Sequence, residues 1–316
     1  MPTSPSRKLS ARYSRPLGVN DRSAWGRRAA DFGISALRGH GPIAVSTLNF
    51  GEIGVSNATA FAATPLNVTA TAAGAGSPTI VGNSSNGYVL INPGTTADTG
   101  YNLQWNVADV PSSLMQFLST PNATIAAGRD IYFGIRCAFA GETTTWDGKV
   151  FMGLAATDTA LLTTADGTIT QSTMDQGVGF HIGEAGVISL VSAETTGNSI
   201  TADAFTVENK GVTAIDMAST FNGQPMCLGS NSVVQGCFHD YFFHAHWEAT
   251  AATGTGCFVE AYFDGKLVAA ITGSAKLPSL TAGDLFPSIE ILNGGTRDCD
   301  MFVAEILVAT PRLHIA

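Results

Sequence analysis

The chain has 316 residues, of which 45% are hydrophobic and 9% aromatic, so it can bury a sizeable core and is not disordered as a whole. Charged residues make up 13%, against roughly 25% in ordinary soluble domains, which favours an assembled protein over a free cytosolic enzyme. The net charge of −9 hides an asymmetry: residues 1–38 hold eight basic residues against Asp21 and Asp31, a charge of +6 that leaves −15 for the rest.

The first residues are basic but lack the apolar stretch of a secretory signal, and no segment approaches 18 uninterrupted apolar residues. We therefore expect neither export by that route nor a membrane partner. The five cysteines are odd in number and form no C-x-x-C pair, which favours reduced thiols packed as small hydrophobic side chains. No cofactor is expected.

Residues 1–20 are predicted to be an extended arm, and residues 21–38 a marginal helix that begins near Asp21 and needs a surface to dock on. The helix would carry one apolar stripe, although two glycines weaken it by about 1 kcal/mol each relative to alanine. The stripe consists of Trp25, Ala29, Phe32 and Ala36. A disordered, solvated tail is the alternative.

Residues 41–128 are rich in Thr, Ala, Gly and Asn, with short apolar pieces such as "TIV" and "YVLI". A low-complexity linker is one interpretation. We prefer the other, in which these pieces supply the opening strands of a sandwich.

After residue 40 the hydrophobic period changes to two, which is typical of strands, and the clearest examples follow residue 128. In "RDIYFGIRCAF", Ile131, Phe133, Ile135, Cys137 and Phe139 alternate with Tyr132, Gly134, Arg136 and Ala138. Similar runs are "VFMGLA", "GVGFHI", "GVISLVS", "PSIEILN" and "MFVAEILVA". Asn-Gly and Asp-Gly pairs recur between runs and suit type I′ hairpin turns; they are Asn86-Gly87, Asp147-Gly148, Asp166-Gly167, Asn222-Gly223, Asp264-Gly265 and Asn293-Gly294. The pattern predicts an all-β, antiparallel sandwich or barrel.

Five of these segments, taken together and in order, resemble a group of tailed-phage virion structural proteins with a concanavalin A-like jelly roll. They are "WDGKVFMGLAATDTALL" (146–162), "DQGVGFHI" (175–182), "CFVEAYFDGKLVAAI" (257–271), "LPSLTAGDLFPSIEILNGG" (277–295) and "DMFVAEILVATPR" (300–312). The likeness covers roughly residues 130–312 and is a pattern of strands and turns.

The resemblance implies one jelly-roll sandwich at residues 41–316. The basic arm at residues 1–40 is not part of the jelly-roll pattern, and it fits an anchor on a shell. The resemblance also implies a capsid decoration, or cement, protein that is not an enzyme. Such a protein would be made in the cytoplasm of the bacterial host and carried on the capsid exterior. Its partners would be the major capsid protein and neighbouring copies of itself. A carbohydrate-binding or receptor-binding virion module is the alternative, because fold alone does not settle function.

The arm carries the residues that we expect to anchor the chain. Arginine pairs bidentately with carboxylates, so an acidic protein surface fits it better than nucleic acid, which the acidic body would repel. The predicted anchoring residues are Arg7, Lys8, Arg12, Arg15, Arg22, Trp25, Arg27, Arg28, Phe32 and Arg38.

The segment "DYFFHAHWE" (240–248) raises the question of a metal site. On a strand, Asp240, Phe242, His244, His246 and Glu248 share one face, and Tyr241, Phe243, Ala245 and Trp247 share the other. We expect the aromatic face to be core and the histidine face to meet solvent or an interface. The alternative is a zinc site at His244 and His246, completed by a group from a neighbouring strand.

Catalytic motifs are absent from the sequence. The E-x-D-x-x-E pattern, which places a nucleophile and an acid on one strand face in laminarinase-like glycosidases, does not occur. Neither does G-x-S-x-G, and "AGAGS" (73–77) lacks the Lys of a phosphate loop. We expect no turnover.

Overall fold

The computed structural model describes eighteen strands and several connecting segments. The described residues are 43–49, 69–73, 79–83, 88–104, 129–141, 146–156, 158, 160–163, 168–170, 174–194, 199–206, 215–221, 224–229, 238–247, 257–273, 276–278, 285–295 and 299–311. Within them the chain is all-β, and no helix there has the length and apolar character to cross a membrane.

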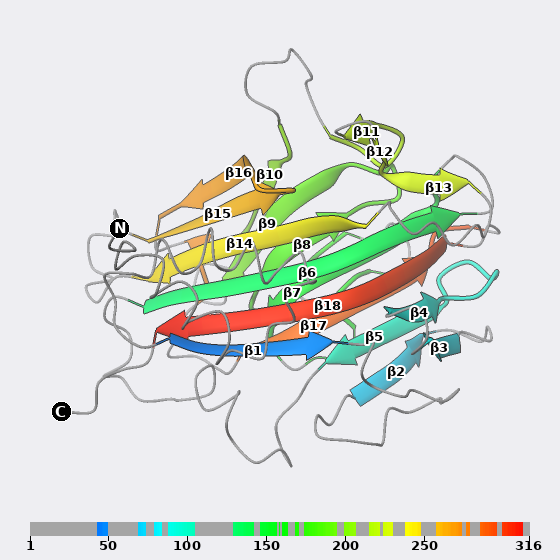
Figure 1. Cartoon of the computed structure of the whole chain (residues 1–316), viewed down its shortest axis with the longest axis horizontal. Helices are drawn as coiled ribbons and strands as arrows, with labels where there is room; N and C mark the ends of the chain where they lie inside the picture. Colours follow the sequence, from blue (N-terminus) through cyan, green and yellow to red (C-terminus); the bar gives the residue numbers. More distant parts are fainter. Residues whose placement is uncertain are drawn as a thin grey trace, which may run out of the picture.

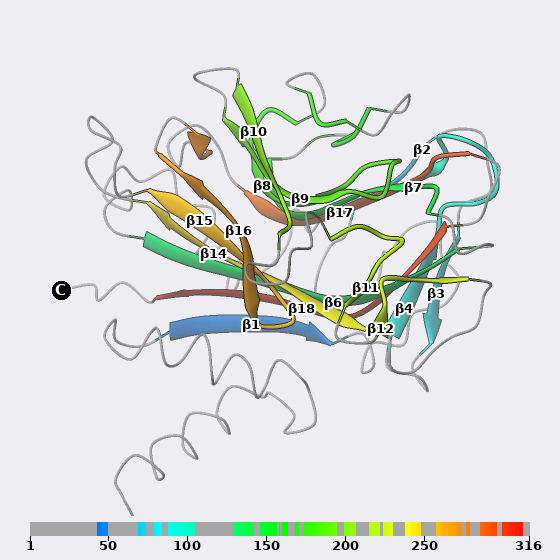
Figure 2. The ribbon, with the colours of Figure 1, turned by 90° about the horizontal axis from the view of Figure 1, so that it is seen from above.

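Two sheets, antiparallel except at one short strand, face each other as the two layers of a sandwich (Figure 2). In the described residues, sheet A runs in the order β16-β15-β14-β6-β18-β4-β3, with β1 also on β18 and the short β13 parallel to β6. Its strands are β1 (Ile43–Asn49), β3 (Thr79–Asn83), β4 (Tyr88–Asn92), β6 (Arg129–Gly141), β13 (Cys227–Gly229), β14 (His239–Trp247), β15 (Phe258–Phe263), β16 (Lys266–Thr272) and β18 (Cys299–Pro311).

Sheet B runs in the order β10-β9-β8-β7-β17-β5-β2. Its strands are β2 (Thr69–Ala73), β5 (Gly100–Gln104), β7 (Gly148–Ala155), β8 (Gly177–Ile182), β9 (Ile188–Glu194), β10 (Ser199–Ala204) and β17 (Phe286–Asn293). A further pair, β11 (Thr220–Phe221) and β12 (Gln224–Pro225), stands apart. Figure 1 shows how β6, β14 and β18 run the length of sheet A. The predicted all-β sandwich is confirmed.

The two sheets bury their facing sides as one core, because strand side chains alternate between faces. On β6 the predicted series from Ile131 to Phe139 is buried in this core. Rings from opposite sheets meet in it: Phe180 of β8 lies 5.4 Å from Tyr241 and 5.8 Å from Phe243 of β14, measured between ring centroids. Every strand-like run named above after residue 128 lies on a strand.

The early stretch also contributes strands. β1 pairs with β18 over its whole length, β4 pairs with β18, and β2 pairs with β5, which pairs with β17. The strand-like pieces of residues 41–128 that the structure describes therefore belong to the two sheets.

The turn predictions have mixed outcomes. Asp264-Gly265 joins β15 to β16 with φ values of 46° and 80°, as a type I′ turn requires. The prediction is wrong for Asp147-Gly148 and Asn293-Gly294, whose residues do not have positive φ. Instead these two segments lie against each other, and the Gly294 N–H donates to the Asp147 carbonyl at 2.6 Å. The Asn86, Asp166 and Asn222 pairs lie outside the described residues.

Candidate functional site

The predicted anchoring residues of the arm precede Ile43, where the described residues begin. Arg7, Lys8, Arg12, Arg15, Arg22, Trp25, Arg27, Arg28, Phe32 and Arg38 all lie outside the described part of the chain. Their role stays a prediction.

The two histidines lie where the alternation places them, on the face of β14 that points away from sheet B. Tyr241, Phe243, Ala245 and Trp247 on the other face are core residues, as predicted. The His244 ring stacks on Tyr132 of β6, with ring centroids 4.5 Å apart and planes 9° apart, and the His246 ring stacks on Phe258 of β15 at 5.3 Å.

These contacts make the histidines part of an aromatic surface. Among the described residues no group of three or more His, Cys, Asp or Glu is placed to hold a metal ion, and Glu248 lies outside them. Each imidazole instead packs flat against a neighbouring ring, an arrangement that buries apolar area and adds about 0.5–1.5 kcal/mol per pair.

The outward face that contains the aromatic surface extends across five strands of sheet A, because the strand register aligns the outward-facing side chains. One cross-strand row holds Leu267, Tyr262 and Phe242, in the order β16, β15, β14. The same row continues through Gly134 of β6 to Leu307 of β18. Exposure falls along it, from 50% at Leu267 to 8% at Phe242 and 1% at Leu307.

A charged row lies next to the aromatic rows on the same face. The Arg136 guanidinium of β6 lies 3.1 Å from the Asp240 carboxylate of β14, and Glu305 of β18 is opposite Arg136 in the register. Burial raises the pKa of Glu305 to about 7, while Arg136 lowers it and the Asp240 charge raises it. Arg136 also lies over the Phe238 ring, 6.0 Å from its centroid.

A second apolar cluster lies farther along this outward face. Tyr88 of β4 meets Phe302 of β18 edge-on, with centroids 5.3 Å apart, and both rings are buried. The cluster also contains Ala138, Ala140, Leu90, Phe238 and Ala304. The outward face of sheet A therefore combines two aromatic regions with an arginine between two carboxyl groups.

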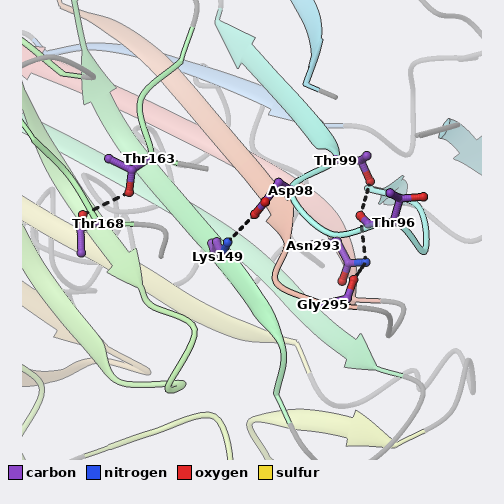
Figure 3. Close-up of polar contacts among 8 residues, drawn as sticks. All are labelled: Thr96, Asp98, Thr99, Lys149, Thr163, Thr168, Asn293 and Gly295. Atoms are coloured by element: carbon purple, nitrogen blue, oxygen red, sulfur yellow. Dashed lines mark hydrogen bonds and ion pairs between the residues drawn. The ribbon is translucent and has the colours of Figure 1, made fainter. Parts of the chain in front are cut away.

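The outward face of sheet B has a different character, because a connecting segment of the chain packs on it. Leu161, Leu162, Ile169 and Met174 pack against Phe151 and other outward-facing side chains of the sheet. Within this segment Thr163 and Thr168 share a hydrogen bond of 3.1 Å (Figure 3).

Polar side chains of sheet B hold the segment in place. The Glu290 carboxylate of β17 accepts hydrogen bonds from the backbone N–H groups of Leu161 and Leu162. Gln104 of β5 donates to the Ala156 carbonyl at 3.0 Å and accepts from the Asp158 N–H at 2.9 Å. Burial raises the pKa of Glu290 to about 8, despite the two N–H donors that lower it.

A buried lysine on β7 of sheet B forms an ion pair with the loop after β4. The Lys149 ammonium lies 2.7 Å from the Asp98 carboxylate (Figure 3). The Asn293 amide donates to the carbonyl of Thr96, in the loop that contains Asp98, and to the carbonyl of Gly295. The Lys149 side chain is fully buried, so its charge is compensated by Asp98 and the ion pair fixes the loop after β4 to β7.

Sequence reasoning missed several residues of these surfaces. The alternation placed Tyr132 and Arg136 opposite the core series, but it did not show which rings of β14 and β15 they meet. Glu290 carried no signal, because its burial depends on a connecting segment more than 120 residues away in the chain.

No family model matches the sequence, and no curated protein sequence matches it. Similar proteins of known structure include the botulinum neurotoxin serotype C1 binding domain, with a TM-score of 0.38, 11% identity and coverage of 77% of this chain and 44% of that chain. The binding domain of botulinum neurotoxin DC in complex with rat synaptotagmin II is similar with a TM-score of 0.38 and 12% identity, over 77% of this chain and 43% of that chain. This chain thus spans less than half the length of these toxin domains.

An endo-1,3-beta-glucanase from Streptomyces sioyaensis is also similar, with a TM-score of 0.45 and 11% identity, over 86% of this chain and 98% of that chain. The assignment of the sandwich here rests on the strand order and register described above.

Proposed function

We propose that the chain is a non-enzymatic virion structural protein with a concanavalin A-like jelly roll, which decorates a phage capsid and adds contacts between major capsid subunits. The sequence segments that resemble such proteins fall on β7, β8, β15 with β16, β17 and β18. Anything that binds the assembled shell more tightly than its free parts stabilises assembly by mass action.

The observation that carries the proposal is the composition of the outward face of sheet A. Protein interfaces are enriched in Tyr, Phe and Arg at their centres and depleted of Lys and Asp. Phe258 and Tyr262 supply partly exposed rings on this face, and Arg136 supplies a guanidinium that is 31% exposed. These residues suit a protein partner.

The basic arm supplies the second half of the proposal. With +6 on residues 1–38 and −15 on the rest, the arm is the part of the chain that an acidic shell surface attracts. The arm would bind in trans to the major capsid protein, and the sandwich would contact neighbouring copies.

The test uses purified capsids that lack the decorating protein. Deletion of residues 1–38 should leave a folded, soluble sandwich by circular dichroism that no longer co-sediments with capsids. Changing Arg22, Arg27 and Arg28 to Gln should weaken binding and reduce its salt dependence, because exposed charge pairs are screened beyond about 10 Å at 0.1 M salt. Full occupancy by the truncated chain would mean that the sandwich itself holds the shell.

A carbohydrate-binding or receptor-binding virion module is the second candidate. One local feature favours it: on the outward face of sheet A the Tyr262 hydroxyl donates to the Glu260 carboxylate at 2.7 Å, beside the rings of Phe242 and His244. Sugar rings stack on aromatic faces and hydrogen-bond to such carboxylates. Millimolar binding of an oligosaccharide that shifts the NMR signals of Tyr262 and His244 would support this candidate.

A further inference from the structure

The outward face of sheet A buries apolar side chains that point away from the sandwich core. Tyr132 is 3% exposed, and Phe242 and Leu307 are comparably buried, although their chain neighbours Phe133, Phe243 and Ile306 occupy the core face. None of the strands in the described ranges lies over this face (Figure 2). Burial requires atoms above these side chains, so another segment must cover them.

The size of the covered region matches one helix. Leu267 on β16 is half exposed, whereas the side chains of the same row on β14 and β18 are buried. The buried part therefore spans β14, β6 and β18, about 10 Å between outer strands at 4.8 Å spacing. An α-helix with its side chains is about 10–12 Å wide.

The position of β1 points to the segment before it. Val45 of β1 pairs with Ala309 of β18, Ala309 pairs with Tyr132 of β6, and Tyr132 pairs with His244 of β14, so Ile43 lies two residues from the row that contains Tyr132. The segment that precedes Ile43 therefore joins the sheet at the end where the covered side chains lie, and β1 is two strands away from β6. The four residues between the helix expected at 21–38 and Ile43 span up to about 13 Å when extended.

We propose that residues 21–38 dock as a helix on the outward face of sheet A of their own chain, with Trp25 and Phe32 against Tyr132, Phe242 and Leu307. An isolated helix with two glycines is marginal in water, and burial of an apolar stripe is what stabilises such helices. The proposal concerns the free chain; the helix would have to leave the sheet before Trp25 and Phe32 could contact a capsid.

The charges of the segment fit the same orientation. At 100° per residue, Arg22 and Arg28 flank the Trp25 stripe at about 60° on either side, and the carboxyl groups of Asp240 and Glu305 belong to the outward row next to Phe242 and Leu307. Arg27 and Arg38 fall on the opposite side of the helix. Docking therefore leaves two arginines outward, available to a partner.

Hydroxyl-radical footprinting of the full chain tests the proposal. The variant Trp25→Ala/Phe32→Ala should raise oxidation of Tyr132, Phe242 and Leu307 several-fold, because the cover is lost. Ile34→Ala is the matched control, since Ile34 falls opposite the stripe, and it should leave oxidation unchanged. Phe133 and Phe243 should stay protected in every variant, which shows that the sandwich is folded.

The charge variants sharpen the test. Arg22→Gln/Arg28→Gln should raise oxidation of the same three residues, and Arg27→Gln/Arg38→Gln should not. Unchanged oxidation both in the Trp25 and Phe32 variant and after deletion of residues 1–38 would overturn the proposal. If oxidation of the same three residues then rose in the variant Leu114→Ala/Phe117→Ala, residues 105–128 would be identified as the covering segment. If diluting the protein removed the protection of Tyr132, Phe242 and Leu307 from oxidation, the covering segment would belong to a second copy of the chain. That result would overturn docking within one chain.

Discussion

At the scale of single residues, the buried acids of the two outward faces are the most informative. Glu290 lies under a connecting segment and accepts two backbone N–H groups, whereas Glu305 lies beside Arg136. Both have a raised pKa because burial disfavours the carboxylate form. The larger rise belongs to Glu290, which has no cationic partner among the described contacts.

We predict that Glu290→Gln flattens the pH dependence of stability. Glutamate in an unfolded chain ionises near pH 4.5, but folded Glu290 keeps its proton until about pH 8. The folded state then binds more protons in this window, so the free energy of unfolding falls as pH rises from 4.5 to 8. Gln accepts the same N–H bonds without titrating. Urea unfolding at pH 5 and pH 8 measures the difference, with the exposed Glu184→Gln as control; equal slopes in wild type and Glu290→Gln would contradict the prediction.

At the scale of elements, the hairpin of β15 and β16 shows sequence acting through turn chemistry. Asp264 and Gly265 both have positive φ, and the Asp264 carboxylate also binds the His239 ring at 2.8 Å and the Asp240 N–H at 3.0 Å. The turn thus fixes the register of β15 and ties the hairpin to the start of β14.

We predict that Gly265→Ala destabilises the protein by about 1–3 kcal/mol, because a Cβ at φ +80° is strained. Gly183→Ala is the control: its Cβ would lie 3.6 Å from the His181 ring, an ordinary contact, at a residue without positive φ. Urea midpoints compare the two variants. Equal midpoints would show that the turn accommodates a side chain.

At the scale of the whole molecule, aromatic contacts join the sheets. Phe180 of sheet B lies among Phe205, Tyr241 and Phe243, with centroids 5.4–5.8 Å apart. Tyr241 and Phe243 belong to the same strand as His244 and His246. Packing of the core therefore holds the strand whose other face carries the candidate surface.

We predict energetic coupling across the layers. Phe180→Leu and Phe243→Leu should each cost about 1–2 kcal/mol, and their double variant should depart from additivity by at least ~0.5 kcal/mol, because the rings touch. Phe180→Leu with Phe302→Leu is the control pair, since Phe302 lies in the outward cluster of sheet A. The free energies of unfolding of the wild type, the single variants and the double variants, measured with a chemical denaturant, complete the double-mutant cycle. Strict additivity for Phe180 and Phe243 would refute the coupling.

The sequence by itself determined the all-β class, the strands after residue 128 and the two faces of β6 and β14, because strand side chains alternate with a period of two. It also determined the turn at Asp264-Gly265, where local backbone geometry requires those residues. Only the tertiary structure decided that Asp147-Gly148 and Asn293-Gly294 abut instead of forming hairpins, and that His244 and His246 stack on Tyr132 and Phe258. Only the tertiary structure likewise decided that the connecting segment with Leu161 and Leu162 packs over Glu290. Strand order, register and burial arise from contacts between residues far apart in the chain. The local periodicity of the sequence does not specify which strands pair with each other.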